Sequence, residues 1–172
     1  MNLTIRKALP DDYMLLTTIG RKTFYDTWRP VNTEEDMQNY MDKSFDSALI
    51  KSDIEADSVN TFLLAFIDKT AVGYSKLRCD RFYDEFKNEA AIEIERIYVL
   101  KEWQRKKVGK AMMDYSINIA LQRNYKWIWL GVNTDNIHAI EFYKSYGFSV
   151  FGEKSFKLGD AVDTDFLMKK QL

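Results

Sequence analysis

One junction constrains the fold of this chain more than any other feature of its sequence. Residues 91–100 are rich in β-branched and aromatic side chains, which favours a strand, and a basic stretch at residues 104–110 follows and opens a helix. Apolar residues then recur at helical spacing, at Val108, Ala111, Met112, Tyr115 and Ile119. Since this pattern predicts one buried helix face, the helix is expected to pack on a sheet.

The same junction has the chemistry of an anion site. The first N–H groups of a helix lack partners within the helix, and the helix dipole adds partial positive charge there. Gly109 lets the backbone approach a ligand closely. Positive charge comes from Arg105, Lys106, Lys107 and Lys110. Taken alone, a cluster of this kind is more simply read as a solvated helix start.

Other segments extend the pattern of strands and helices. Pro10 suits the first turn of a helix, and Thr33 with the acids after it is a capping signature for a second helix. Residues 62–67 and 71–77 predict an antiparallel hairpin. The remaining expected elements are a strand at 3–8, a helix near 49–54, a strand at 127–132, a helix capped by Thr134 or Asp135 that stops at Gly147, and a closing hairpin of residues 148–156 and 164–169 around Gly159. We expect a single domain over residues 1–172, because no repeat or linker interrupts them.

Charge and cysteine content exclude several classes of function. The 25 basic residues nearly balance the 26 acidic ones, and a net charge of -1 does not favour a nucleic acid or an anionic membrane as partner. The single cysteine, Cys79, cannot form an internal disulfide, and the N-terminus lacks the pattern of a signal peptide. We therefore expect a cytoplasmic protein that neither binds nucleic acid nor enters a membrane.

Two motifs in this order resemble those of the GNAT superfamily of N-acetyltransferases. Gln104 and Gly109 fall in register with the glycine-rich acetyl-CoA motif of that family, with Ala111 just after it, although Lys107 stands where its first glycine is usual. Residues 130–148 resemble the family's later strand, its helix with a conserved asparagine and tyrosine, and the Gly-Phe strand that follows. The resemblance implies an α/β (α+β) GNAT fold: a mixed, mostly antiparallel sheet of about seven strands, flanked by helices, with a splayed strand pair that binds acetyl-CoA.

The resemblance also implies roles for individual residues. The backbone of the strand would pair with the pantetheine arm of acetyl-CoA, and the loop after it would hold the pyrophosphate. Asn136 would bond the pantetheine, and Tyr143 would lie near the thioester sulfur. No metal is implied. The residues expected to bind acetyl-CoA are Ile97, Tyr98, Val99, Gln104, Arg105, Lys106, Lys107, Val108, Gly109, Lys110, Ala111, Asn136 and Tyr143.

A closer resemblance, over nearly the whole chain, is to bacterial spermidine/spermine acetyltransferases of the PaiA type. It rests on Thr23-Phe24, on residues 93–98, on residues 128–132 and on residues 155–160. This resemblance implies that the acceptor is a polyamine or a related amine.

Transfer to an amine needs a base and an acid. A primary amine has a pKa of about 10 and is mostly protonated at neutral pH. Glu93 and Glu95 alternate onto one face of the strand that receives the cofactor, so either could remove the proton, and the spacing of Glu93 resembles that of the catalytic glutamate in histone-type members of the family. Tyr143 would protonate the departing thiolate. The plainer alternatives are that the two glutamates are surface acids without a catalytic role and that Tyr143 is a core residue.

The acceptor, the occurrence of turnover and the oligomeric state each keep an alternative. The acceptor could instead be a protein N-terminus, a lysine side chain or another small amine, and the chain could bind acetyl-CoA without turnover as a regulator. The strands near the C-terminus could pair between subunits, so a homodimer is possible.

Overall fold

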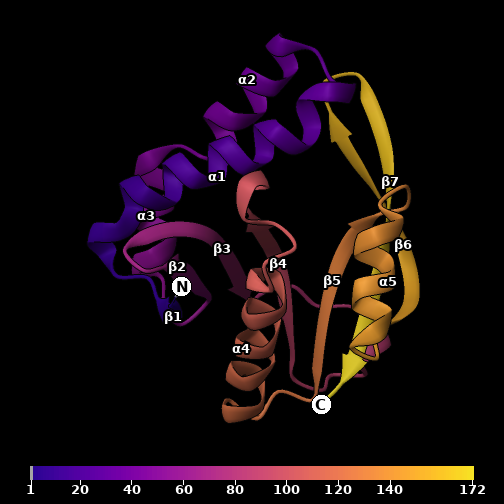
Figure 1. Ribbon diagram of the computed structural model, residues 1–172. Coiled ribbons are helices and arrows are strands. Elements are labelled where there is room, and N and C mark those ends of the chain that lie inside the picture. The colour runs from indigo at the N-terminus through magenta and orange to yellow at the C-terminus, as the bar shows by residue number, and fades with distance from the viewer. Residues whose placement is uncertain (1) are drawn as a thin grey trace.

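The computed structural model describes residues 2–172 and has a seven-stranded mixed sheet (Figure 1). Its strand order is β1-β2-β3-β4-β5-β7-β6. Neighbouring strands are antiparallel except for β4 and β5, which are parallel and joined by a helical crossover. The strands are β1 (Leu3–Lys7), β2 (Asn60–Ile67), β3 (Thr70–Arg78), β4 (Ala91–Val99), β5 (Trp127–Asn133), β6 (Ser149–Leu158) and β7 (Ala161–Gln171). The expected fold, with about seven strands, is confirmed.

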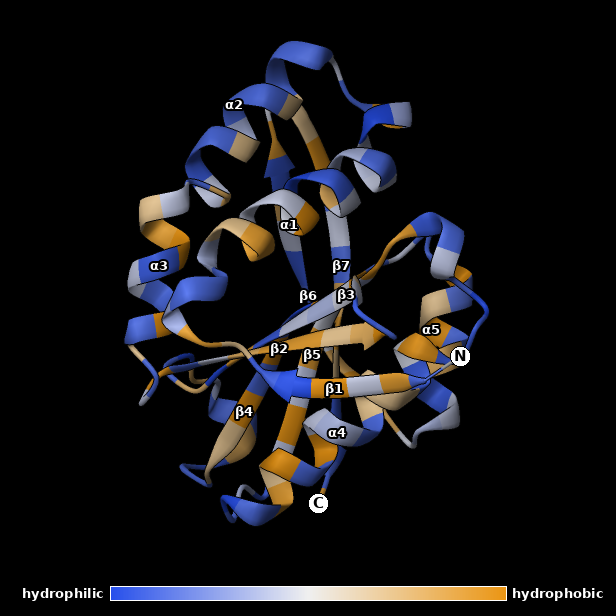
Figure 2. Cartoon of the chain, turned by 60° about the vertical axis from the view of Figure 1, so that its left-hand side comes forward, coloured by the Kyte–Doolittle hydropathy of each residue, from blue (hydrophilic) through white to orange (hydrophobic). Residues whose placement is uncertain are grey.

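Helices cover both faces of this sheet. The first group, α1 (Tyr13–Trp28), α2 (Glu34–Ser44) and α3 (Ser47–Glu55), packs on one face, and α4 (Val108–Gln122) with α5 (Ile137–Ser145) packs on the other. Side chains of β2 point to both faces of the sheet. Phe62 and Leu64 join the core under α1–α3, and Ala65 and Ile67 join the core under α4. Figure 2 shows the hydrophobic colour along β2 inside the molecule and a largely hydrophilic α2 on its outside.

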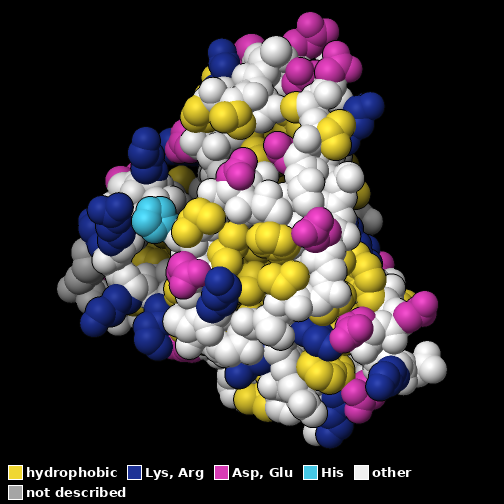
Figure 3. Space-filling view, turned by 90° about the vertical axis from the view of Figure 1, so that its right-hand side faces the viewer, with side chains coloured by type: hydrophobic (Ala, Val, Ile, Leu, Met, Phe, Trp, Pro, Cys, Tyr) yellow, Lys and Arg dark blue, Asp and Glu magenta, His cyan; other side chains and the backbone are white. Residues whose placement is uncertain are grey.

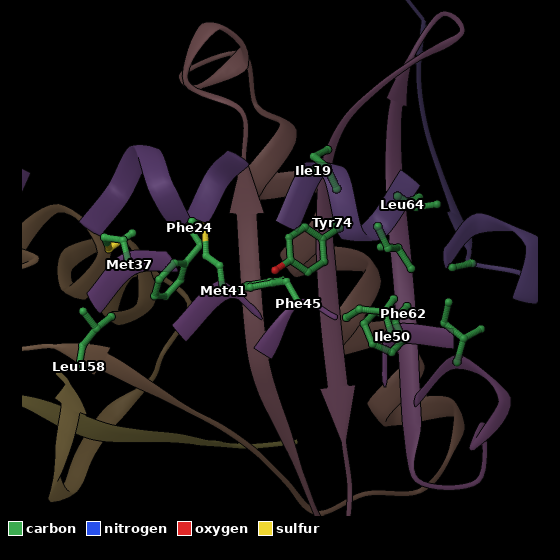
Figure 4. Packing of buried hydrophobic residues seen from close by; sticks show 13 residues of the cluster. Ile19, Phe24, Met37, Met41, Phe45, Ile50, Phe62, Leu64, Tyr74 and Leu158 are labelled. Atoms are coloured by element: carbon green, nitrogen blue, oxygen red, sulfur yellow. The ribbon is translucent and has the colours of Figure 1, made fainter. Parts of the chain in front are cut away.

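An aromatic and methionine-rich core holds the first three helices on the sheet (Figure 4). Phe24 stacks on Tyr40 with 4.5 Å between ring centroids, and Leu158 of β6 is buried in the same cluster. The tip of the β6–β7 hairpin therefore packs against α2. At that tip Gly159 has φ +59°, and a side chain there would collide with Asp36 of α2, so glycine is required.

The ends of the helices confirm one expected cap and correct another. Thr33 caps α2, since its hydroxyl accepts a hydrogen bond from the Asp36 N–H at 3.2 Å. The prediction that Thr134 or Asp135 caps α5 is wrong, because Asn136 is the cap and accepts from Ala139 N–H at 3.1 Å.

The buried face of α4 also differs from the prediction. Val108 and Met112 are buried as expected, but Tyr115 is 36% exposed. Met113 and Ser116 are fully buried instead. The stripe that faces the sheet is therefore rotated away from Tyr115 toward the side of Met113.

The β6 edge and α5 share one side of the molecule, where Figure 3 shows hydrophobic side chains beside charged ones. Ile137 of α5 and Val150 of β6 are among the exposed hydrophobic residues, as is Val162 of the neighbouring strand β7. Because β6 is an edge strand, it is free to pair, and a homodimer stays a prediction. Within residues 2–172, no helix is both long enough and apolar enough to cross a membrane.

Candidate active site

The two parallel strands of the sheet separate partway along their length. β4 pairs with β5 over residues 91–94, opposite residues 127–130, and the described chain has no further pair between them. β4 continues against β3 as far as Val99, and β5 continues against β7 as far as Asn133. Because each strand keeps its outer neighbour, the facing edges beyond this point carry backbone groups that no strand uses (Figure 1).

A β-bulge lies where the separation begins. Lys76 of β3 is opposite Arg96 and Leu77 is opposite Ile94, so Glu95 is an extra residue on β4 without a partner on β3. A bulge increases the local twist of a strand. The bulge at Glu95 therefore contributes to the separation of β4 from β5.

A cleft of about 580 Å³ occupies this separation. One wall comes from β4 with Trp28 of α1, and the other comes from β5, α5 and the β6–β7 hairpin. Both faces of the sheet contribute to it, since α1 lies on one face and α5 on the other. Two ligands could thus enter from opposite faces and meet between the strands.

The loop at the start of α4 is held in an unusual backbone conformation. Arg105 and Lys107 have φ values of 61° and 64°, in the left-handed region, and Lys107 is the residue that precedes the first turn of α4. Glycine adopts this conformation without strain. Lys107, where the motif has a glycine, therefore holds a left-handed conformation that is strained for a lysine.

The backbone of the same loop can bind an anion. Among residues 2–172, no backbone acceptor pairs with the N–H groups of residues 105–110. A Cβ added at Gly109 would meet only Val99 Cγ2, at 3.9 Å, so nothing inside the chain requires glycine there. These N–H groups lie in a basic loop at a helix start, which is a place suited to a pyrophosphate.

The side chains of this loop differ in what they contact. Gln104 Nε2 donates to the carbonyl of Val99 at 3.2 Å and so ties the loop to the end of β4. Lys106 lies over the Trp103 ring at 4.3 Å. The Val108 side chain is buried in the core, which leaves only its backbone N–H for a ligand.

Two expected residues of α5 line the cleft. Asn136 starts the helix, and Tyr143 lies two turns further along, buried between Phe142 and Phe148. Burial raises the pKa of Tyr143 above its usual value, so its hydroxyl keeps its proton at neutral pH.

The two candidate glutamates line the cleft in different electrostatic surroundings. Glu93 is 2% exposed, and both of its carboxylate oxygens lie 3.1 Å from Arg81 Nη1. Burial raises the pKa of Glu93, although Arg81 opposes the shift. For Glu95, burial would also raise the pKa, but nearby cations outweigh it and lower the pKa to about 2. Lys76 lies 2.8 Å from the Glu95 carboxylate, and Arg78 and Arg81 lie 3.1 and 3.0 Å away.

Sequence reasoning missed several charged residues of the cleft. Arg81 bridges the two glutamates, and Asp165 of β7 and Lys154 of β6 project into the same space. No local pattern marks these residues, because only the strand order β5-β7-β6 brings the C-terminal hairpin to the cleft.

Aromatic residues of α1 and of the loop after β3 differ in whether they line the cleft. Phe24 and Trp28 line the cleft. Tyr25 instead donates to Glu34 at 2.8 Å, and Tyr83 packs edge-on against Trp129 outside the cleft lining.

Known proteins resemble this chain over its full length. The sequence matches the profile of the Acetyltransferase (GNAT) family over residues 21–148. An uncharacterized N-acetyltransferase of Lactobacillus delbrueckii subsp. lactis is 35% identical over 166 residues, which cover 96% of this chain and 93% of the relative. A spermidine N(1)-acetyltransferase of Thermoplasma acidophilum is 26% identical over 174 residues, which cover 99% and 98%. The crystal structure of PaiA N-acetyltransferase from Thermoplasma acidophilum in complex with coenzyme A has a TM-score of 0.80 and 23% identity, with 100% of both chains covered.

The chain therefore belongs to the GNAT family of acetyltransferases and is an N-acetyltransferase of GNAT type. The expected family is confirmed, and the structural likeness confirms the expected fold. The roles of the individual site residues stay predictions.

Proposed function

We propose that this chain transfers the acetyl group of acetyl-CoA directly to a primary amine while both are bound in the cleft between β4 and β5. The observation that carries this proposal is the cleft itself, which holds a free strand edge, a buried glutamate and a buried tyrosine, while β4 leads from it to the helix start suited to an anion. Acetyl-CoA supplies an activated acyl group and a phosphate-rich handle, and the cleft and the helix start match these two chemistries.

The residues fit acetyl-CoA along the β4 side of the cleft. The free edge at Ile97, Tyr98 and Val99 would pair with the amide groups of pantetheine as an added strand does. The N–H groups of residues 105–110 would hold the pyrophosphate, with Gln104 and Ala111 framing the loop. Asn136 would bond the pantetheine from the α5 side.

Each wall of the cleft would supply one group for proton transfer, a base from β4 and an acid from α5. Glu93 is the better base of the pair, because its raised pKa makes it more basic than an ordinary glutamate. Glu95, with a pKa of about 2, is a weak base. Its carboxylate would instead hold Lys76, Arg78 and Arg81 in place. Tyr143 would give its proton to the departing sulfur, and the N–H of Val99 would polarise the thioester carbonyl.

A polyamine such as spermidine or spermine is the acceptor we propose. The Thermoplasma acidophilum relative is a spermidine acetyltransferase, and the cleft of this chain holds the carboxylates of Glu93 and Asp165, which suit an ammonium group. The alternatives are a protein N-terminus, a lysine or another small amine, and a regulator that binds acetyl-CoA without turnover.

The test is thiol release from acetyl-CoA by the purified protein with spermidine, spermine, a lysine peptide or an aminoglycoside, beside a control without acceptor. Preferred turnover of the polyamines is expected. Preferred turnover of another amine would keep the reaction and reject the polyamine. Binding of acetyl-CoA without turnover of any amine would favour the regulator.

A further inference from the structure

Lys154 places a primary amine inside the cleft. Lys154 belongs to β6, and β7 lies between β6 and β5 in the sheet. Asp165 of β7 is the residue opposite Lys154. The side chain reaches back over β7, so that Cε and Nζ would lie only 3.0 and 3.1 Å from a Cβ on Gly131 of β5. Because residue 131 is glycine, the lysine amine has room to lie directly over β5.

This position is the narrow end of the cleft. Gly131 follows Leu130, the last residue of β5 that pairs with β4. The amine of Lys154 therefore lies where the two strands begin to part, and the Asp165 carboxylate lies 3.5 Å from the same point above Gly131. In the function proposed above, Glu93, which would take the proton of the acceptor amine, lines this part of the cleft.

The lysine has charged neighbours but no fixed partner. Within residues 2–172, no carboxylate oxygen lies within 4.0 Å of Lys154 Nζ. Its charge nevertheless opposes the burial that raises the pKa values of Glu93 and Asp165. Lys76 of β3 differs from Lys154, because it forms ion pairs with Asp53 at 2.7 Å and with Glu95 at 2.8 Å. Lys154 is thus a tethered alkylamine in a cleft that also holds the carboxylates of Glu93 and Asp165, which is the chemistry expected of a bound acceptor.

We infer that Lys154 is itself an acceptor, and that the enzyme acetylates this side chain when no amine occupies the cleft. The inference rests on the proposed function, since it uses the same cosubstrate. A bond forms between Nζ and the acetyl carbon while the carbon–sulfur bond breaks. The ammonium first gives one proton to Glu93 or Asp165. After the attack Nζ gives up a second proton, which replaces the one that Tyr143 donates to the departing sulfur, so coenzyme A leaves as a thiol. The product is a neutral N-acetyl-lysine, which makes the cleft more negative by one charge.

The experiment uses the full chain and acetyl-CoA without an amine, followed by intact-mass measurement and peptide mapping over time. One acetyl group on Lys154 is expected, and it should appear at least about tenfold faster than on Lys157, an exposed lysine of the same strand. Lys154→Arg should lose this modification, and Tyr143→Phe should slow it at least about tenfold. Saturation with an amine that the enzyme turns over should slow it as well.

Two results would overturn the inference. One is an unmodified Lys154. The other is acetylation of Lys154 at the rate seen for Lys157 or for the urea-unfolded chain, which would mark a purely chemical reaction. Thiol release with the amine panel is measured on the same preparation. Turnover of an amine without acetylation of Lys154 would reject this inference and leave the proposed function standing.

Discussion

Lys107 occupies a backbone position that suits glycine. Its φ of 64° costs a lysine about 1 kcal/mol relative to an unstrained conformation. Lys107→Gly should therefore raise the free energy of unfolding by about 0.5–1 kcal/mol, measured by urea denaturation. Lys106→Gly is the matched control, because residue 106 is not among the described positions with positive φ, and it should give no gain. Equal effects of the two substitutions would contradict the strain argument.

Tyr143 is the candidate acid, and its hydroxyl can be removed alone. Tyr143→Phe should lower kcat about a hundredfold, because the thiolate would leave without a positioned proton. The KM for acetyl-CoA should change little, since the ring remains. Tyr115→Phe deletes the same group on α4, where Tyr115 lies outside the cleft lining, and should leave kcat unchanged. A normal kcat in Tyr143→Phe would remove the acid role.

The proposed role of Glu93 as the base predicts how kcat changes at low pH. A base must be deprotonated, so kcat should fall as the pH drops through the pKa of Glu93, which burial places above the usual glutamate value. Glu93→Gln should lower kcat and abolish this limb. Glu153→Gln, on the exposed face of β6, should keep both the rate and the limb. An unchanged acid limb in Glu93→Gln would assign it to another group.

The sequence could predict residues whose roles depend on local pattern. Gln104, Gly109 and Asn136 stand at fixed spacings from a strand end or a helix start, and they lie at the cleft or at its loop. The sequence could not separate Glu93 from Glu95. That difference comes from Arg81 and Lys76, which approach from a loop and from β3.

At the scale of elements, hydrophobic periodicity predicted the strands and helices because each has one or two faces buried in the core. The hairpin of β2 and β3 and the helix after β4 follow from such local patterns. The cap of α5 was missed because Thr134, Asp135 and Asn136 are all good capping residues. The Asn133 side chain accepts from Asp135 N–H at 2.8 Å, and this turn moves the helix start to Ile137.

The ion pairs between β3 and β4 predict that the stability of the fold decreases in acid. Glu95 has a pKa of about 2 in the folded chain against a reference value of 4.5. A lowered pKa means that the carboxylate stabilises the fold above about pH 4.5, and that this stability is lost as the pH falls toward 2. The contribution at neutral pH is about 3 kcal/mol.

Glu95→Gln should therefore lower the free energy of unfolding at pH 7 by about 3 kcal/mol, since it leaves three cations around an uncharged group. The deficit relative to the unmodified chain should shrink as the pH is lowered toward 2. Urea denaturation across this range measures both effects. Glu153→Gln should change the free energy by less than about 0.5 kcal/mol. A deficit independent of pH would show that Glu95 acts by packing alone.

At the scale of the whole molecule, the cleft exists only because distant segments meet. Trp28, Glu93, Tyr143 and Asp165 come from α1, β4, α5 and β7, and the order of strands in the sheet sets their distances. Motif spacing predicts the proposed cofactor side, most of which lies within the unit of β4, its loop and α4, with Asn136 and Tyr143 added from α5. The acceptor side has no such unit, so its residues could not be predicted from the sequence.

The most direct test of the account is the initial rate of thiol release with acetyl-CoA and spermidine both varied. If both substrates meet in the one cleft, double-reciprocal plots at fixed spermidine concentrations should give intersecting lines, as transfer within a ternary complex requires. Parallel lines would contradict the account, because they would mean that an acetyl-enzyme forms and coenzyme A leaves before the amine binds.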